Sequence, residues 1–263
     1  MTEENHVISY DRISRIYDVS RTVNIETVRK LVRLLNVNSD SVFLDLGCGT
    51  GNYTAALQKA AKTLVGIDIS KGMIEQAQAK FPEIHLICGD VTSLPFDSET
   101  FDGAFAIQLI HHIKKKEIFF KEAHRVFRKG GCLAIHSCSH RQIRAFWFYH
   151  YFSKGLEVDL ARIPDSDEII LMLERAGFSN IGIEVCYQDE VVTHETPQSY
   201  LDKNYRDSIS TFAFLSQKDI EAGCRKLQKD IASGFVERLV EQSRSKVATV
   251  GGTTIVYGKK GSS

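Results

Sequence analysis

The sequence predicts a doubly wound α/β fold, with a seven-stranded, mostly parallel sheet and a helical cap made by two insertions. First, a β-branched and aromatic run, Val42–Leu46, leads through a glycine-rich turn into a helical segment. Second, a strand followed by a helix recurs five times, and two closing strands follow. Third, residues 139–164 and 188–251 interrupt this order. Because connections in compact domains usually have about 4–6 residues, we interpret both segments as insertions.

The N-terminal part of the chain is expected to supply two helices. Tyr10, Ile13 and Tyr17 stand at helical spacing, which predicts an amphipathic helix over residues 10–19. A second helix is expected over residues 24–35, before the first strand. The helix over residues 10–19 either covers an edge of the sheet or belongs to a separate N-terminal lid, residues 1–22.

The remaining elements follow from hydrophobic runs and from helix breakers. Strands are expected at residues 42–46, 63–69, 84–88, 101–106, 132–137, 181–187 and 253–257. Helices are expected at residues 53–61, 115–128 and 167–176, and one more opens with Ser70 as its N-cap. Gly130 and Gly131 should stop the helix over residues 115–128, and Gly177 should cap the helix over residues 167–176. We leave residues 259–263 out of the fold prediction.

These elements divide the chain into a core and a cap. The core is expected to contain residues 23–138, 165–187 and 252–258. The cap should contain residues 139–164, which are rich in aromatic side chains, and residues 188–251, with helical patterns at 197–205 and 217–243. Both insertions leave the carboxyl ends of strands, the edge where open α/β sheets bind ligands. An aromatic-lined cap implies a small, largely apolar or planar ligand.

Charge and hydropathy argue against a nucleic-acid partner and a membrane span. Among 263 residues, Lys+Arg and Asp+Glu both number 33, so the formal net charge is zero. A nucleic-acid partner needs phosphate-neutralising charge. No apolar run approaches the roughly 20 residues of a membrane span, and the first ten residues are polar and acidic rather than signal-like. We expect a cytoplasmic protein.

The cysteine pattern predicts reduced thiols rather than a metal site. The six cysteines are scattered without any Cys-x-x-Cys pair. Cys88, Cys132 and Cys186 fall within expected strands, so we expect them to be buried. No disulfide framework and no bound metal are predicted.

The glycine-rich turn predicts a ligand site. Gly47, Gly49 and Gly51 lack Cβ atoms, so backbone N–H groups can approach a ligand at the N-terminus of the following helix. Dinucleotide enzymes use a similar turn, but their sixth position holds a small residue. That position is Asn52 here, which disfavours a nicotinamide oxidoreductase.

The sequence from 44 to 51, LDLGCGTG, resembles the first motif of the class I S-adenosylmethionine-dependent methyltransferases. Leu94-Pro95-Phe96, followed by Phe101-Asp102, resembles the small-molecule, methyltransferase-11-like members. The resemblance implies a Rossmann-like methyltransferase (EC 2.1.1) that uses S-adenosyl-L-methionine and releases S-adenosyl-L-homocysteine. It also implies a small-molecule methyl acceptor.

The donor site is expected at the ends of the first strands. Asp68 ends the second strand at about the 20-residue spacing of a ribose-binding acid, so it should accept both ribose hydroxyls. The resemblance gives Asp90 the adenine amino group, Val91 the adenine ring and Gln108 the position beneath the methyl donor. In the related enzymes a helix like residues 10–18 folds over the cofactor, so Tyr17 or Arg21 would meet its carboxylate. The expected donor-binding residues are Tyr17, Asp45, Gly47, Cys48, Gly49, Gly51, Asp68, Ile69, Met73, Asp90, Val91 and Gln108; Met73 could instead belong to the core.

The catalytic residue is harder to predict, because methyl transfer depends mainly on positioning. Proximity can supply on the order of 7–11 kcal/mol, whereas a general base adds roughly 10²–10⁴-fold in rate. If the acceptor carries a proton, the candidate bases are His111 and His112, then His140. Further candidates are His136, His150, His194, Tyr200 and Tyr205; a soft acceptor such as a thiol would need no base.

Other functions remain open from the sequence. A non-catalytic regulatory protein that binds the cofactor is one alternative, since the residues that the sequence predicts best are those that bind the methyl donor. A methyltransferase of a protein substrate is another, which would favour an open, charged groove over a cap.

Overall fold

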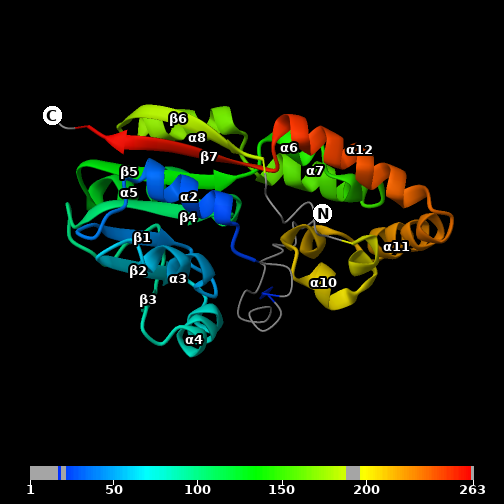
Figure 1. The fold of residues 1–263 in the computed structure, drawn as a ribbon, viewed down its shortest axis with the longest axis horizontal. Helices are drawn as coiled ribbons and strands as arrows, with labels where there is room; N and C mark the ends of the chain where they lie inside the picture. The colour runs from blue at the N-terminus through cyan, green and yellow to red at the C-terminus, as the bar shows by residue number, and fades with distance from the viewer. Residues whose placement is uncertain (1–16, 19–21, 188–195, 262–263) are drawn as a thin grey trace, which may run out of the picture.

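The computed structural model describes residues 17–18, 22–187 and 196–261, and a seven-stranded sheet forms its centre (Figure 1). The strands are β1 (Val42–Leu46), β2 (Thr63–Asp68), β3 (His85–Cys88), β4 (Phe101–Ile107), β5 (Phe127–Ser137), β6 (Phe178–Cys186) and β7 (Thr253–Lys260). Their order is β3-β2-β1-β4-β5-β7-β6. β7 is antiparallel to β5 and β6, and the other neighbouring pairs are parallel. The predicted doubly wound, mostly parallel sheet is confirmed.

Helices cover both faces of this sheet, which a largely parallel sheet requires. Those of the core are α2 (Ile25–Leu34), α3 (Asn52–Gln58), α4 (Lys71–Lys80), α5 (Lys116–Val126) and α8 (Ser166–Arg175), with the short 3₁₀ helix η1 (Ile110–His112). Successive residues of β1 serve opposite faces: Phe43 packs with α2 and α3, whereas Leu44 packs with α5 and α8. The two faces therefore carry two separate apolar clusters.

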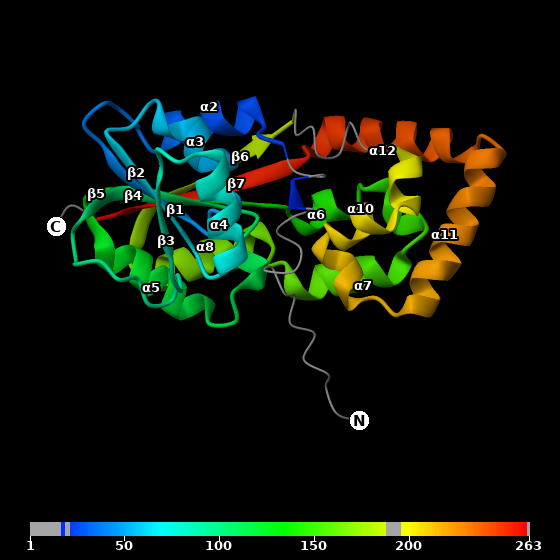
Figure 2. The same cartoon turned by 90° about the horizontal axis from the view of Figure 1, so that it is seen from below.

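The two insertions fold together beyond the carboxyl end of β5 (Figures 1 and 2). Their elements are α6 (His140–Ile143), η2 (Trp147–His150), α7 (Ser153–Arg162), η3 (Pro197–Leu201), α10 (Lys203–Asp207), η4 (Ser210–Phe214), α11 (Gln217–Ala232) and α12 (Phe235–Val250). A third apolar cluster unites them, because Trp147 and Phe148 of the first insertion pack against Tyr200 of the second. Within the described ranges, no helix combines the length and apolarity that a bilayer span needs.

The strand order reverses direction between β1 and β4. The chain moves outward from β1 through β2 to β3, then returns to place β4 on the other side of β1. The loops that leave β1 and β4 therefore diverge at their carboxyl ends and leave a crevice. The glycine turn and Gln108 both lie at this switch point.

The prediction for the segment around the glycine pair was wrong. The helix α5 ends at Val126 rather than at residue 128, and β5 begins at Phe127 rather than at residue 132. Phe127 is buried and pairs with Phe101, and its carbonyl oxygen accepts a hydrogen bond from Lys260 Nζ at 2.7 Å. Burial of this aromatic ring outweighs the helical pattern, and the glycines lie where the register with β4 shifts.

The closing strands are longer than predicted. β6 begins at Phe178 instead of residue 181, and β7 continues to Lys260 instead of residue 257. Leaving residues 259–263 out of the fold prediction was an error, because Lys259 pairs with Cys132 and Lys260 pairs with Phe178. Polar residues at the end of a strand give no hydrophobic signal, and their pairing partners lie far away in the sequence.

Two smaller expectations also need correction. The helical pattern at residues 217–243 forms two helices, α11 and α12, separated by Gly234 at φ 71°. Cys88 is exposed at the end of β3, whereas Cys132 and Cys186 are buried as expected. Because β3 is an edge strand with an exposed face, a residue within it need not be buried.

Gln142 of α6 joins the first insertion to the second insertion and to β7. The side chain is 1% exposed. Its Nε2 donates to the carbonyl oxygens of Val250 (3.2 Å) and Thr253 (2.9 Å). Its Oε1 accepts from the Ser139 amide (2.8 Å) and from Thr254 Oγ1 (3.0 Å). One buried amide therefore satisfies polar groups at the start of α6 and in residues 250–254, more than 100 residues further along the chain.

We expect Gln142→Leu to lower the free energy of unfolding by about 3 kcal/mol, because it leaves buried donors and acceptors without partners. Urea unfolding followed by circular dichroism measures this change. Gln242→Leu, at an exposed position of α12, is the matched control and should change stability by less than about 0.5 kcal/mol. Equal stability of the two variants would contradict the joining role of Gln142.

Candidate active site

The glycine turn after β1 is anchored to the neighbouring strand. The amides of Gly47 and Cys48 both donate to the carbonyl oxygen of Ile67, at 2.8 and 3.1 Å. Gly47, Gly49 and Gly51 have φ values of 73°, 53° and 78°, a backbone region that favours glycine. The turn is therefore held against the end of β2. A Cβ at Gly47 would collide with the Leu109 side chain, and one at Gly51 would crowd Ala77.

Asp68, the last residue of β2, faces this turn. Its Oδ2 accepts a hydrogen bond from the Gly49 amide at 2.9 Å, and its Oδ1 accepts one from the Ser70 amide at 2.9 Å. Both bonds fix the carboxylate at the carboxyl edge of the sheet, where the sequence places a ribose-binding acid.

Asp45 lies inside the site rather than on its surface. The residue is 1% exposed, and its Oδ2 accepts a hydrogen bond from Thr54 Oγ1 of α3 at 2.7 Å. The pKa of Asp45 is raised to about 7: burial is the main cause, the Thr54 bond opposes the shift, and the charge of Asp68 adds to it. Asp45 thus ties α3 to β1 beneath the turn, with a carboxyl group that is partly protonated near neutral pH.

The other residues predicted for the nucleoside lie beside Asp68. Ile69 follows it and is 69% exposed, which is unusual for such a side chain at the end of a buried strand. Val91 is buried, and Asp90 is exposed with its Oδ1 bonded to the amide and hydroxyl of Thr92 at 2.8 Å each. Met73 lies buried in α4, which matches the alternative that it belongs to the core.

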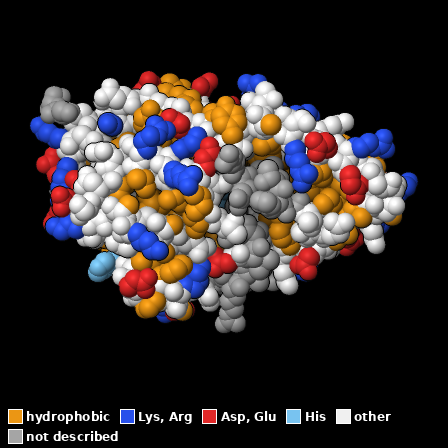
Figure 3. Space-filling model, in the orientation of Figure 1, with side chains coloured by type: hydrophobic (Ala, Val, Ile, Leu, Met, Phe, Trp, Pro, Cys, Tyr) orange, Lys and Arg blue, Asp and Glu red, His pale blue; other side chains and the backbone are white. Residues whose placement is uncertain are grey.

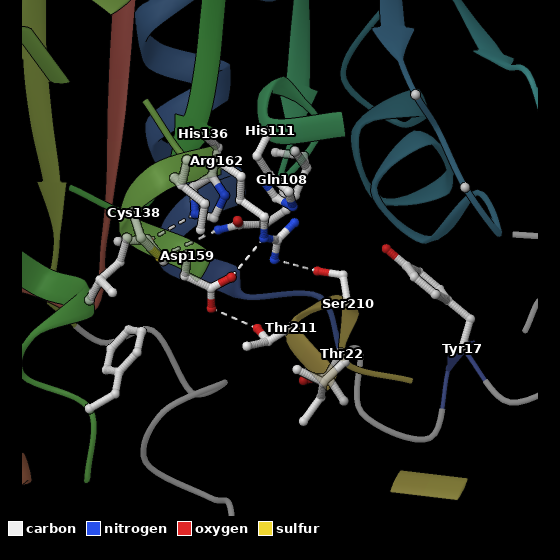
Figure 4. Close-up of a pocket in the computed structure, with 18 of the residues that line it drawn as sticks. Tyr17, Thr22, Gln108, His111, His136, Cys138, Asp159, Arg162, Ser210 and Thr211 are labelled. Atoms are coloured by element: carbon white, nitrogen blue, oxygen red, sulfur yellow. Dashed lines mark hydrogen bonds and ion pairs between the residues drawn. The ribbon is translucent and has the colours of Figure 1, made fainter. Parts of the chain in front are cut away.

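A cavity extends from the glycine turn to the two insertions (Figure 4). Gly47, Gly49 and Tyr17 line one end of it. Gln108, at φ 51° after β4, lines its middle, and Gln108 Nε2 lies 3.8 Å from Cys138 Sγ. Aromatic side chains from the insertions line the other end: Phe146, Trp147, Phe148, Tyr149 and Tyr200.

The candidate bases occupy different places. His111 of η1 lines the cavity, and its ring centroid lies 3.9 Å from that of His112, which is absent from the described lining. His140 is also absent from that lining; its Nε2 lies 2.8 Å from the Ile163 carbonyl oxygen, which fixes α6 against α7. His136 does line the cavity, and its Nε2 lies 2.8 Å from Thr253 Oγ1. His194 and Arg21 fall outside the described residues.

The sequence did not reveal a polar group within the aromatic insertion. Asp159 and Arg162 of α7, together with Tyr149, Ser210 and Thr211, line the cavity as one hydrogen-bonded network (Figure 4). The helical spacing of Asp159 and Arg162 was the available signal. The same spacing is also typical of an exposed ion pair. The Asp159–Arg162 pair is buried because η4, about fifty residues further along the chain, packs against it.

The N-terminal segment reaches the glycine turn at Asp18, although most of the helix predicted over residues 10–19 lies outside the described residues. Asp18 Oδ1 accepts from Thr50 Oγ1 (2.6 Å) and Asn52 Nδ2 (3.0 Å), and its Oδ2 accepts from Lys80 Nζ (2.6 Å). Next to it, Tyr17 Cε1 lies 3.7 Å from the position that a Cβ on Gly49 would take. A side chain there would fill the space between the turn and Tyr17.

Comparisons with known proteins agree with this geometry. The methyltransferase domain family matches residues 44–135. A demethylmenaquinone methyltransferase of Staphylococcus carnosus is 27% identical over 206 residues, which cover 69% of this chain and 85% of that protein. The crystal structure of a putative methyltransferase from an antibiotic biosynthesis pathway of Anabaena variabilis is 26% identical, with a TM-score of 0.76 over 91% of this chain and 99% of that chain. Phosphoethanolamine N-methyltransferase 2 of Haemonchus contortus, in complex with S-adenosyl-L-methionine, shares the fold at 16% identity, with a TM-score of 0.63 over 95% and 57% of the two chains.

The chain is a class I S-adenosylmethionine-dependent methyltransferase, and its cofactor is S-adenosyl-L-methionine. The residues present fit this cofactor. A Cβ at Gly49 would fill the space between the turn and Tyr17, and the Asp68 carboxylate is held beside this turn by the Gly49 amide. Among the described residues, no group of three His, Cys, Asp or Glu side chains is placed to bind a metal ion.

We expect Asp68→Ala to weaken binding of S-adenosylhomocysteine by about tenfold or more, because it removes a charged acceptor of hydrogen bonds. Titration calorimetry measures the dissociation constant. Asp40→Ala, an exposed position just before β1, is the control and should bind with unchanged affinity. Equal affinities of Asp68→Ala and the wild-type protein would contradict the ribose assignment.

Proposed function

We propose that this methyltransferase acts on a small, planar, largely apolar acceptor held between the glycine turn and the two insertions. The observation that carries the proposal is the shape of the cavity, which joins the turn to five aromatic side chains. Aromatic rings offer large apolar contact areas and stack against planar molecules. The relatives named demethylmenaquinone methyltransferases also support a small ring-containing acceptor.

In this proposal the described parts of residues 139–164 and 188–251 act as a cap, and Tyr17 and Asp18, which lie at the glycine turn, belong to a lid. Their packing supports this division, because the insertion elements share one apolar cluster that is separate from the two clusters of the sheet. The cap excludes water from the reacting atoms, which strengthens electrostatic interactions within the site. The surface view shows basic and acidic side chains interspersed on one face of the molecule, a pattern that favours a small acceptor over a macromolecule bound in a charged groove (Figure 3).

In this proposal the protein's residues bind the methyl donor, orient the acceptor and take up the acceptor's proton. When bound, S-adenosyl-L-methionine supplies a methyl group on a positively charged sulfur. In the proposal, the glycine turn, Asp68, Ile69 and Val91 hold the nucleoside, and Asp45 supports the turn from below. The aromatic cap places the acceptor in line with the methyl group, and positioning of this kind supplies most of the rate enhancement. His111 lines the cavity and takes the acceptor proton.

The acceptor class can be tested with the purified protein and a methyl-tritiated donor. A panel of hydroxynaphthalenes and reduced naphthoquinones is incubated beside a heat-denatured protein extract and an RNA fraction. We expect label in the low-mass, solvent-extractable products of the ring compounds. Label confined to precipitated protein or RNA would contradict the proposal.

We expect His111→Gln to lower kcat by roughly 10²–10⁴-fold on such an acceptor, because it removes the general base. Steady-state kinetics with the labelled donor measure the change. His112→Gln is the matched control, since its ring touches His111 while His112 itself is absent from the described lining of the cavity. We expect a loss of less than about tenfold for it. A similar loss in both variants, or none in His111→Gln, would contradict the assignment of the base.

A further inference from the structure

We infer that Arg162 binds an oxygen atom of the acceptor, either a ring carbonyl or a phenolate, and thereby orients the ring toward the methyl donor. This inference deepens the proposed function and rests on it. The residue ends α7 in the first insertion and lines the cavity.

The guanidinium of Arg162 is fixed on two sides. Its Nε donates to Asp159 Oδ1 at 2.7 Å, and its Nη2 donates to Ser210 Oγ at 2.7 Å (Figure 4). Its Cζ also lies 5.3 Å from the centroid of the Phe214 ring. The side chain is 14% exposed. Arg162 is therefore held in place by both insertions before any ligand is present.

The remaining nitrogen of this group has donors that the protein does not use. Nη1 is buried, and none of the described residues forms a hydrogen bond with it. A guanidinium carries five N–H donors in a rigid fork, and the two bonds to Asp159 and Ser210 leave three donors, two of them on Nη1. A buried charged donor without a partner costs free energy, and a ligand oxygen in the adjoining cavity would remove this cost.

Asp159 already accepts three hydrogen bonds, and none of them comes from Arg162 Nη1. Its side chain is 3% exposed. Its Oδ2 accepts from Tyr149 Oη and Thr211 Oγ1, both at 2.6 Å, while its Oδ1 accepts from Arg162. Three donors from η2, η4 and α7 hold the carboxylate, so Asp159 is a positioning residue that aims the guanidinium.

The charge of this network selects the class of ligand. Asp159 compensates Arg162, so the pair carries no net charge, and a dianionic phosphate or a cationic amine would lack a counter-charge there. A carbonyl oxygen accepts hydrogen bonds without adding charge, and a phenolate adds a single negative charge. The aromatic side chains around the network suit a ring that carries such an oxygen.

Binding of an isosteric pair of probes tests the inference without catalysis. The probes are 1-tetralone, whose carbonyl accepts hydrogen bonds, and tetralin, the hydrocarbon of the same shape, each titrated by calorimetry in saturating S-adenosylhomocysteine. We expect the wild-type protein to bind 1-tetralone about tenfold more tightly than tetralin. Arg162→Met should lose this preference while its affinity for S-adenosylhomocysteine stays within about twofold. Arg225→Met, an exposed ion-paired position of α11, is the control and should keep the preference.

Asp159 loses its counter-charge in Arg162→Met, and this variant could fold poorly. The double variant with Asp159→Asn removes both charges and keeps the partners of Tyr149 and Thr211, so it replaces the single variant if melting temperature falls. A preference for 1-tetralone that persists in the variants, or is missing in the wild-type protein, overturns the inference. Labelling of precipitated protein or RNA alone by the wild-type enzyme instead overturns the proposed function, so the two failures are distinguishable.

Discussion

The site depends on the attachment of the glycine turn to the end of β2. Two amides of the turn donate to the Ile67 carbonyl oxygen, and a third donates to the carboxylate of Asp68. These bonds hold the glycine-rich loop against an acid at the switch point of the sheet. Because the neighbouring strands are parallel and their register is fixed, the carboxyl ends of β1, β2 and β4 lie at one edge. The buried Asp45 then secures α3 beneath the turn.

The sequence predicted the glycine turn, Asp68 and the strands around them because the sequence signals for these features are local. A run of apolar residues, three glycines and an acid at the end of the next strand lie within a short stretch, and each has one dominant structural explanation. The errors arose where distant partners decide the structure. Phe127 joins β5 instead of extending α5 because its backbone pairs with Phe101, its ring packs against Phe178 and its carbonyl oxygen accepts from Lys260. The pairing of Lys259 with Cys132 has no local signal.

The other half of the cavity could not be predicted residue by residue. The aromatic content of residues 139–164 indicated an apolar lining, which agrees with the positions of Trp147 and Tyr149. The network around Asp159 depends on η4, from the other insertion, so neither segment shows it alone. Among the three expected bases, His111 lines the cavity, while His140 serves the packing of α6 against α7. The sequence does not distinguish a histidine that lines a cavity from one that packs between helices, whereas the three-dimensional structure does.

A crystal structure of the protein with S-adenosylhomocysteine tests the central claim most directly. The account predicts electron density for the ligand across the carboxyl ends of β1, β2 and β3, with the ribose hydroxyls on Asp68 and the adenine ring beside Ile69 and Val91. It also predicts that the ligand sulfur faces the cavity lined by His111 and Arg162. Density at any other place, or a glycine turn that closes over these strand ends and excludes the ligand, would contradict it.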